Sequence, residues 1–236
     1  MTLATLSQAE LQRRILFESE DVVVVDKPWG IPSTGRRLSD PDSVQYALMQ
    51  RYVGMTWAVH QLDADTSGVN VFVRRRNLVK VWQTRMRFPT GEKTYLAVVH
   101  GEFTADRTIE APVGVVRTTP SRHLGITADG RRAVTRFEVL SRNTDFSLLR
   151  VQIETGRTHQ IRIHATSIGH SLVGETWYRE TPCRRHPRQA LHAFELRFHD
   201  KEEPEALTCP VATDLLELIR SLDLHLPAAF AVSPTL

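Results

Sequence analysis

The chain has 236 residues, of which 41% are hydrophobic and 24% are charged, and its net charge is +3. These proportions are typical of a soluble globular protein and permit a substantial core. No apolar stretch could cross a bilayer and the N-terminus lacks a signal-peptide layout, so the sequence predicts a cytoplasmic protein without a membrane partner. Two cysteines imply no disulfide framework, and the ten histidines lack zinc spacing, so no metal site is expected.

Most of the basic residues are arginines, and they cluster in two segments of the chain. Arginine accounts for 26 of the 30 basic residues and lysine for 4. Basic side chains gather in residues 74–87 and 184–188, whereas residues 202–223 lean acidic. An arginine-rich proteome or a solvated surface would explain part of this bias. Because a guanidinium binds phosphate through a planar fork and stacks on bases, the clustering favours a nucleic-acid partner.

Apolar periodicity and turn residues predict short elements in the first third of the chain. They are a helix over 8–14, strands over 15–18 and 22–26, a helix over 43–51 capped by Ser43, a strand over 69–73 and a basic amphipathic helix over 77–88. The turn Pro28-Trp29-Gly30 closes the strand pair, and Pro89 ends the last of these helices.

The rest of the chain is expected to be richer in strands. Strands are predicted over 95–99, 134–140, 146–154 and 193–198, hairpins and loops over 101–133, and helices over 158–167 and 213–222. The pattern indicates an α+β fold, with a mixed, mainly antiparallel sheet and flanking helices. We expect one domain over residues 1–226 and a loose C-terminal tail over 227–236.

Two blocks carry the residues most suited to chemistry. Residues 60–68 (HQLDADTSG) lie between two apolar runs, and Gly68, free to take a positive φ, lets this loop present a short carboxylate on rigid supports. Residues 156–164 (GRTHQIRIH) follow a predicted strand and begin a predicted helix. Together the blocks predict a site at which an aspartate works beside a guanidinium. Taken alone, an aspartate in such a loop more often forms an Asx-turn or a cap.

Both blocks resemble signatures of the RluA-type family of RNA pseudouridine synthases, which read HRLDxxTSG and GRTHQIRxH. Four further stretches resemble the family in the same order: DKPWG at 26–30, EKTYLA at 92–97, GHSLVG at 169–174 and RQALHA at 188–193. The third departs from the family's GHPLVGD at Ser171 and Glu175. The matches cover roughly residues 15–215, and six in sequence are far more specific than one.

The resemblance implies an enzyme that isomerises uridine to pseudouridine in RNA, on the pseudouridine synthase catalytic fold and without a cofactor. It assigns Asp63 to the glycosidic bond, where charge develops on the ribose as the bond weakens. It places Tyr95 against the uracil, with its hydroxyl taking part in proton transfer, and it pairs Arg162 with the aspartate. Asp65 is expected to hydrogen-bond within the loop, and His192 to be a packing or loop residue.

Four further residues are expected near RNA. Arg157, His159 and Gln160 are expected to shape the helix start and to hold RNA phosphate or neighbouring loops. Gln61 stands where the family pattern has an arginine that contacts RNA and helps to hold the target nucleotide out of its stack. An amide still hydrogen-bonds a base edge but brings no charge, so this departure bears on RNA affinity more than on the chemical step. Lys27 is expected to be structural rather than catalytic.

The resemblance also bears on the partner and on the alternatives. The KPxG-like turn begins at position 27, which leaves no room before it for the S4-type RNA-binding domain of some family members. Target choice would then rest on the domain's own basic face and on the shape of a stem-loop in ribosomal or transfer RNA, with no obligate protein partner. One alternative is a synthase-derived RNA-binding or RNA-folding protein in which Gln61 reflects weakened catalysis. Another is a hydrolase, because residues 65–68 faintly resemble the Asp-Thr-Gly loop of aspartic proteases, but no second loop supplies the paired carboxylate.

Overall fold

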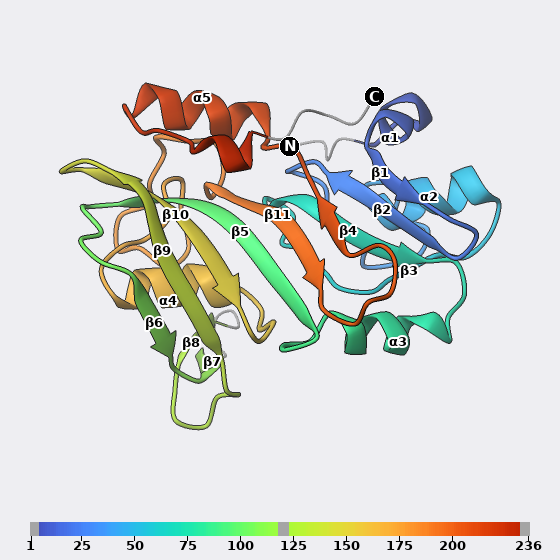
Figure 1. The fold of residues 1–236 in the computed structure, drawn as a ribbon, viewed down its shortest axis with the longest axis horizontal. Helices are drawn as coiled ribbons and strands as arrows, with labels where there is room; N and C mark the ends of the chain where they lie inside the picture. The colour runs from blue at the N-terminus through green and yellow to red at the C-terminus, as the bar shows by residue number, and fades with distance from the viewer. Residues whose placement is uncertain (1–4, 118–122, 232–236) are drawn as a thin grey trace. The chain divides into compact units, whose positions relative to one another are not determined.

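The computed structural model describes residues 5–117 and 123–231, which gather into two compact units (Figure 1). The first unit comprises residues up to 91 together with 192–212, and the second comprises residues 92–191 together with 213–231. Each unit holds a mainly antiparallel sheet with helices beside it, and the predicted α+β fold is confirmed. The single domain expected over residues 1–226 remains a prediction, because compactness does not decide whether two units fold independently.

The first unit is built on four strands in the order β1-β2-β4-β11, with β3 paired to β4 and β12 paired to β11. All of these pairs are antiparallel except β4 with β11, which is parallel. The elements are α1 (Gln8–Arg13), β1 (Ile15–Glu18), β2 (Val22–Lys27), α2 (Val44–Tyr52), β3 (Trp57–Ala58), β4 (Ser67–Val73), α3 (Leu78–Arg85), β11 (Leu191–Phe198) and β12 (Ala206–Thr208).

The valine run of β2 explains why this strand is central. Successive side chains of a strand point to opposite faces, so a run without polar residues needs cover on both. Val23 and Val25 pack with Leu48 of α2 on one face, whereas Val22 and Val24 pack with apolar side chains of β4 and α3 on the other. The Ser43 cap predicted for α2 is confirmed, because its hydroxyl accepts a hydrogen bond from the Tyr46 backbone N–H at 3.2 Å.

The second unit has a sheet in the order β5-β10-β9-β6 and a separate hairpin of β7 with β8. In Figure 1, α4 lies behind β9 and β10, and the Gln160 side chain at its start donates to the Val134 carbonyl of β9 at 2.9 Å. The elements are β5 (Gly91–His100), β6 (Arg107–Glu110), β7 (Val113–Arg117), β8 (His123–Ile126), β9 (Val134–Arg142), β10 (Phe146–Ile153), α4 (Gln160–Ser167), α5 (Thr213–Ser221) and η1 (Ala228–Phe230).

Some boundaries differ from those that the sequence predicted. The strands β3 and β12 were not predicted, because two or three residues carry too short a pattern to recognise. The helix α4 begins at Gln160 because His159 has a left-handed backbone, with φ 57°, that no helix continues through. Part of the expected loose tail is ordered: Ala228–Phe230 form η1, and Phe230 is buried. Residues 232–236 of that tail lie outside the described ranges.

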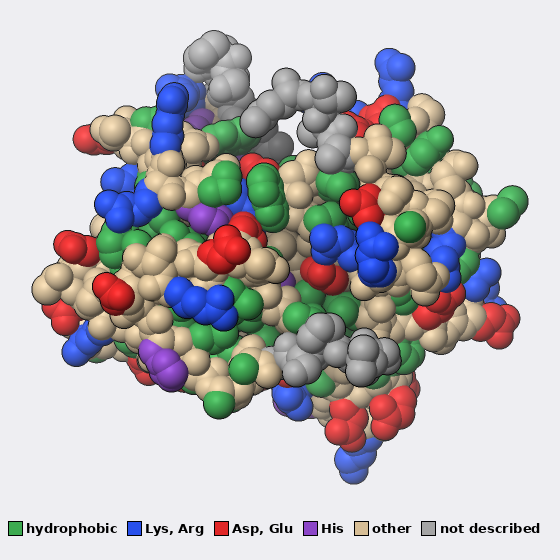
Figure 2. Space-filling model, turned by 90° about the horizontal axis from the view of Figure 1, so that it is seen from above, with side chains coloured by type: hydrophobic (Ala, Val, Ile, Leu, Met, Phe, Trp, Pro, Cys, Tyr) green, Lys and Arg blue, Asp and Glu red, His purple; other side chains and the backbone are tan. Residues whose placement is uncertain are grey.

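Some of the arginines are buried and form ion pairs within the fold. Arg85 is buried and donates to both carboxylate oxygens of Asp200, at 2.7 and 3.1 Å. Arg188 is buried and donates in the same way to Asp214, at 2.7 and 3.1 Å. Each arginine comes from one of the basic clusters, so the clusters combine structural residues with surface charge. Figure 2 shows basic and acidic side chains interspersed over the face seen from above.

The loop between α4 and β11 makes a close approach that yields a stability prediction. Gly174 has φ +80°, and a Cβ there would overlap the backbone carbonyl of Arg188. We expect Gly174→Ala to lower the free energy of unfolding, measured in urea, by roughly 2 kcal/mol or more, since strain and backbone overlap add. Gly169→Ala is the control, because Gly169 has φ +83° with open space around it and should cost about 1 kcal/mol. Equal losses in the two variants would contradict the overlap.

Candidate active site

The Asp63 loop leads from β3 into β4 in the first unit. Its turn is closed by a hydrogen bond from the Thr66 backbone N–H to the Asp63 carbonyl at 2.9 Å. Just before the aspartate, the Leu62 N–H donates to the Ser33 hydroxyl at 3.0 Å, which ties the loop to the segment before α2. Asp63 is half-buried, whereas Gln61 and Asp65 are exposed. The loop therefore holds the Asp63 backbone in place from both sides.

The buried ammonium group of Lys27 is hydrogen-bonded to the Asp63 loop. Lys27 is fully buried, and its Nζ donates to the carbonyls of Pro28 at 2.9 Å, Ile31 at 2.6 Å and Ala64 at 2.8 Å. The Gly30 N–H donates to the same Ala64 carbonyl at 2.9 Å. Because an ammonium has three protons to donate, these contacts join the KPxG-like turn to the residue after Asp63. They support the structural role that the sequence favoured for Lys27.

The end of the loop is fixed against β11. Gly68 has φ +114°, as the sequence led us to expect, and a Cβ there would overlap the Ala193 backbone. The neighbouring Ser67 hydroxyl lies 2.9 Å from Nδ1 of His192, and both side chains are buried. His192 is thus a packing residue, as the sequence indicated, but one that pairs directly with the loop.

The start of the loop is held by its first histidine. The Val71 backbone N–H donates to Nε2 of His60 at 3.2 Å, and Nδ2 of Asn70 donates to the His60 carbonyl at 3.1 Å. With Lys27 below and Ser67 at the far end, β4 and its neighbours constrain the loop at its start, middle and end. Because the loop is already held in place, binding a ligand beside this carboxylate should not require the entropy cost of ordering the loop.

In the second unit, Gln160 organises the start of α4. Its Oε1 accepts from the Thr155 hydroxyl at 2.8 Å and from the Arg157 N–H at 3.1 Å. Its Nε2 donates to the Val134 carbonyl and to the Thr135 hydroxyl, both at 2.9 Å. The amide is buried and engaged at both ends inside the protein. Gln160 therefore shapes the helix start, and its expected contact with RNA remains a prediction.

Arg157 and His159 flank this amide. Nε of Arg157 donates to the Arg132 carbonyl at 3.0 Å, and the side chain stays partly exposed. Nδ1 of His159 lies 2.6 Å from the Tyr178 hydroxyl, while its ring meets that of Trp177 edge-on at 5.5 Å. A left-handed backbone on a residue other than glycine is strained and persists where the surroundings hold it, often at functional sites.

Arg162 forms a buried bidentate ion pair with Glu175. Its Nε lies 2.8 Å from Oε2 and its Nη2 lies 2.9 Å from Oε1 of the glutamate. Oε1 also accepts from the Trp177 N–H at 2.8 Å. Burial by itself would raise the pKa of Glu175, but the hydrogen bonds and charge of Arg162 outweigh it and lower that pKa below the usual value. The pair holds the guanidinium plane in one orientation.

The sequence reasoning missed Glu175 as a site residue, although it noted the glutamate as a departure from the family's aspartate. The signal was an acidic residue in a glycine-rich stretch shortly after α4. The resemblance assigned Asp63 as the partner of Arg162, and the structure shows an ion pair of Arg162 with Glu175. Asp63 belongs to the first unit and Arg162 to the second, so their pairing remains a prediction.

Tyr95 lies on β5 and is almost completely buried, opposite Val151 of β10. Lys93 stands two residues earlier, so its side chain leaves the strand on the same face. Burial lowers the pKa of Lys93 to about 8, which makes it partly neutral near that pH. Lys93 belongs to the family-like stretch EKTYLA, but it was not among the predicted site residues.

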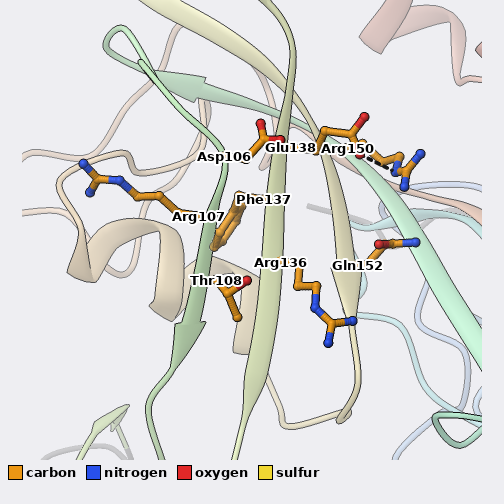
Figure 3. Close-up of a pocket in the computed structure, with 8 residues that line it drawn as sticks. All are labelled: Asp106, Arg107, Thr108, Arg136, Phe137, Glu138, Arg150 and Gln152. Carbon is orange, nitrogen blue, oxygen red and sulfur yellow. Dashed lines mark ion pairs between the residues drawn. The ribbon is translucent and has the colours of Figure 1, made fainter.

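A pocket of about 230 Å³ lies on the sheet of the second unit (Figure 3). Its charges are largely engaged within the protein: Arg150 lies 3.0 Å from Glu138, and Asp106 accepts from the Val139 N–H at 2.9 Å. None of the predicted site residues lines it, so it is not the candidate active site. The lining residues are Asp106, Arg107, Thr108, Arg136, Phe137, Glu138, Arg150 and Gln152.

In residues 5–117 and 123–231, no three His, Cys, Asp or Glu side chains are placed so that they could hold a metal ion. Every helix in those ranges is too short or too polar to span a bilayer.

Known proteins resemble this chain over most of its length. An uncharacterized RNA pseudouridine synthase of Bacillus subtilis, YlyB, is 36% identical over 220 residues, which cover 88% of this chain and 72% of the relative. The ribosomal large subunit pseudouridine synthase D of Nitrosomonas europaea is 32% identical over 231 residues, covering 91% of this chain and 67% of the relative. The structure of human RNA Pseudouridylate Synthase Domain Containing 4 has the same fold, with a TM-score of 0.74 at 22% identity, covering 93% of this chain and 97% of that one.

A sequence model of the family described as RNA pseudouridylate synthase matches residues 21–167. The matched residues include the Asp63 loop, Tyr95 on β5 and the whole of α4. The resemblance seen in the six motifs is therefore confirmed by comparisons that extend well beyond them. The chain belongs to the RNA pseudouridine synthase family, in its RluA-type branch, and is an isomerase that converts uridine to pseudouridine.

Proposed function

We propose that the protein isomerises specific uridines in a stem-loop of ribosomal or transfer RNA, with Asp63 acting at the glycosidic bond. The observation that carries this proposal is the half-buried carboxylate on a loop fastened by Lys27, His60 and Ser67. The name of the Nitrosomonas europaea relative, which refers to the large ribosomal subunit, supports ribosomal RNA as the substrate. The reaction requires no cofactor and no obligate protein partner.

The chemistry is an intramolecular rearrangement. The bond from ribose C1′ to uracil N1 breaks, the uracil turns, and C1′ bonds to C5, which gives up its proton while N1 gains one. Positive charge develops on the ribose as the first bond weakens, so a nearby carboxylate stabilises that state. Asp63 supplies this carboxylate. Tyr95 lies against the uracil, and its hydroxyl takes part in the proton transfer.

Arg162 keeps the carboxylate ionised and oriented when the substrate closes the site. The bidentate pair with Glu175 supports this role, because it fixes the guanidinium before any substrate arrives. Charge-assisted hydrogen bonds depend steeply on geometry, so a fixed donor plane is worth more than a mobile one. Arg162 thus acts as an oriented hydrogen-bond donor, and Glu175 as the residue that positions it.

RNA recognition falls to residues around these groups. Gln61 is exposed next to the catalytic aspartate, where its amide can hydrogen-bond a base edge or a phosphate. Arg157 and His159 stand at the start of α4 and contribute a charge and a ring. The alternative, an RNA-binding protein with weakened catalysis, rests on Gln61 alone, and the presence of Asp63, Tyr95 and Arg162 argues against it. Chemical mapping of pseudouridine across total RNA, with and without the gene, identifies the target.

Replacing the catalytic carboxylate tests the proposal most directly. Asp63→Asn should lower the single-turnover rate by at least roughly 10³-fold, because the isosteric amide brings no negative charge. RNA affinity and the melting temperature should stay near wild type. Asp65→Asn is the matched control, since Asp65 is exposed on the same loop and should keep most of the rate. Asp63→Asn turnover within tenfold of wild type would assign the chemistry elsewhere.

Removing the buried ammonium tests the support of the loop. Lys27→Met keeps much of the side-chain length but removes a donor from three carbonyls, of which Ala64 keeps the Gly30 N–H, so we expect a loss of roughly 2–4 kcal/mol in the free energy of unfolding. The rate on bound RNA should fall as well, because the Ala64 carbonyl next to Asp63 loses one of its two donors. Lys80→Met on the exposed surface of α3 should change neither quantity. A Lys27→Met variant with wild-type stability and rate would show that the contacts are dispensable.

The glutamine at position 61 gives a prediction about target choice. Without a guanidinium to fill the place of the extruded nucleotide, the enzyme should favour uridines that are already unpaired, where extrusion costs less than the few kcal/mol typical of a duplex. Gln61→Arg should therefore tighten binding to stem-embedded uridines more than to loop uridines. The comparison uses matched hairpins that differ only in the position of the uridine, titrated at one salt concentration. Equal gains on both would mean that the arginine merely adds charge.

A further inference from the structure

The second unit has a pocket that the proposed chemistry does not use. It has a volume of about 510 Å³, within the range of about 300–1,000 Å³ typical of pockets that hold small organic groups. Its walls are the strands β7 and β8, the C-terminal half of α4 and residues 177–180. Apolar side chains make up much of the lining, with aromatic rings and one arginine among them. The lining residues are Val116, His123, Leu124, Gly125, Ile126, Ile163, Thr166, Ser167, Trp177, Tyr178, Arg179 and Glu180.

Trp177 is the most unusual of these residues, because 62% of it is exposed. Its backbone N–H donates to the buried Glu175 carboxylate at 2.8 Å, so the ring is carried on a fixed backbone. The rings of His159 and Trp177 meet edge-on at 5.5 Å, an arrangement in which the edge of one ring faces the plane of the other. A large aromatic ring held in place yet open to solvent is typical of a contact surface.

A second ring is fixed beside it. The hydroxyl of Tyr178 lies 2.6 Å from Nδ1 of His159, and the Tyr178 ring lies 5.2 Å from that of His123 on β8. These contacts connect the hairpin to the start of α4 through aromatic side chains. The pocket therefore has an aromatic rim that is fixed by contacts within the protein.

The charged side chains that line the pocket are one arginine, Arg179, and one glutamate, Glu180. Arg179 hydrogen-bonds the Ser171 hydroxyl at 2.7 Å and the Thr181 carbonyl at 3.2 Å, both of which are uncharged, so its positive charge is retained. Arg117 is exposed and directly follows the lining residue Val116 on β7. Glu180 is the one acidic residue among the residues that line the pocket. An exposed aromatic ring with a guanidinium at the same pocket suits a nucleobase and its phosphate better than it suits an apolar peptide.

We propose that this pocket holds an unpaired nucleobase of the RNA, stacked on Trp177, with Arg179 close to a flanking phosphate. The inference rests on the proposed function, because it takes the substrate to be RNA. Stacking on a ring accepts every base, so the pocket contributes affinity for single-stranded RNA rather than sequence specificity. It would hold a nucleotide other than the target uridine.

The experiment uses full-length protein and a fluorescein-labelled oligocytidine of about 12 nucleotides, a length within the range that one binding surface covers. Cytidine lacks the uracil of the reaction, so binding is measured apart from catalysis. Trp177→Ala should weaken binding by roughly 5- to 100-fold, the range expected for loss of one stacked base. Trp177→Phe keeps an aromatic face and should retain most of the affinity, whereas Trp177→Leu keeps apolar bulk alone and should behave like alanine.

Two further readouts separate stacking from other contributions. The slope of affinity against salt should be the same for Trp177→Ala and wild type, because the variant loses no phosphate contact. A blunt RNA duplex of equal strand length should bind wild type and Trp177→Ala alike, since its bases are already stacked. Met55→Ala, which removes a partly exposed apolar side chain from the other unit, should leave oligocytidine binding unchanged.

Each contrary outcome has a distinct meaning. Oligocytidine affinity that is unaffected by Trp177→Ala overturns the base pocket, and so does equal affinity of the phenylalanine and leucine variants. A change in oligomeric state without a change in RNA binding assigns the surface to a second copy of the chain and overturns the proposal as well. If wild-type protein forms pseudouridine in cellular RNA while these tests fail, only the pocket is refuted. If wild type forms none, the proposed function fails first.

Discussion

The buried ammonium of Lys27 is the constraint on which the candidate site most depends. A charge out of water is costly unless its hydrogen bonds are satisfied, and here the three carbonyls of Pro28, Ile31 and Ala64 accept from it. Two of those carbonyls belong to the KPxG-like turn region and one to the Asp63 loop. The buried ammonium therefore stabilises the observed loop geometry. Any displacement of the loop would leave the ammonium or a carbonyl without a hydrogen-bond partner, which costs free energy. A residue distant from the aspartate in sequence thus governs where the aspartate lies.

The second unit uses buried charge in a comparable way. Arg162 and Glu175 satisfy each other through two hydrogen bonds, and the same carboxylate fixes the backbone that carries Trp177. Burying such a pair is seldom a large gain in stability, but removing one partner is expensive, so the geometry is strongly specified. One glutamate therefore links the arginine assigned to catalysis with the aromatic rim of the neighbouring pocket. The strained backbone of His159 lies at the same junction, held by Tyr178.

Most of the fold could be predicted because its elements have strong local signals. The valines of β2, the Ser43 cap of α2 and the glycine requirement at position 68 are each readable from a few neighbouring residues. The elements that were not predicted depend instead on contacts with distant residues. The strands β3 and β12 exist through pairing with longer strands, and η1 exists because Phe230 finds a buried position. The location of each arginine could not be predicted either, because the sequence does not distinguish a buried arginine from a surface one. Arg85 and Arg188 are buried against aspartates far along the chain.

By itself the sequence determined the family, the α+β class and the identity of the candidate catalytic aspartate, because these follow from short motifs in a fixed order. Only the tertiary structure decided which side chains support those motifs. Lys27 reaches Ala64, His192 reaches Ser67, and Glu175 takes up Arg162, and none of these partnerships is encoded by spacing. The physical reason is that neighbouring residues set local backbone preferences. The partner of a buried polar group is instead whichever group the fold brings within hydrogen-bonding distance.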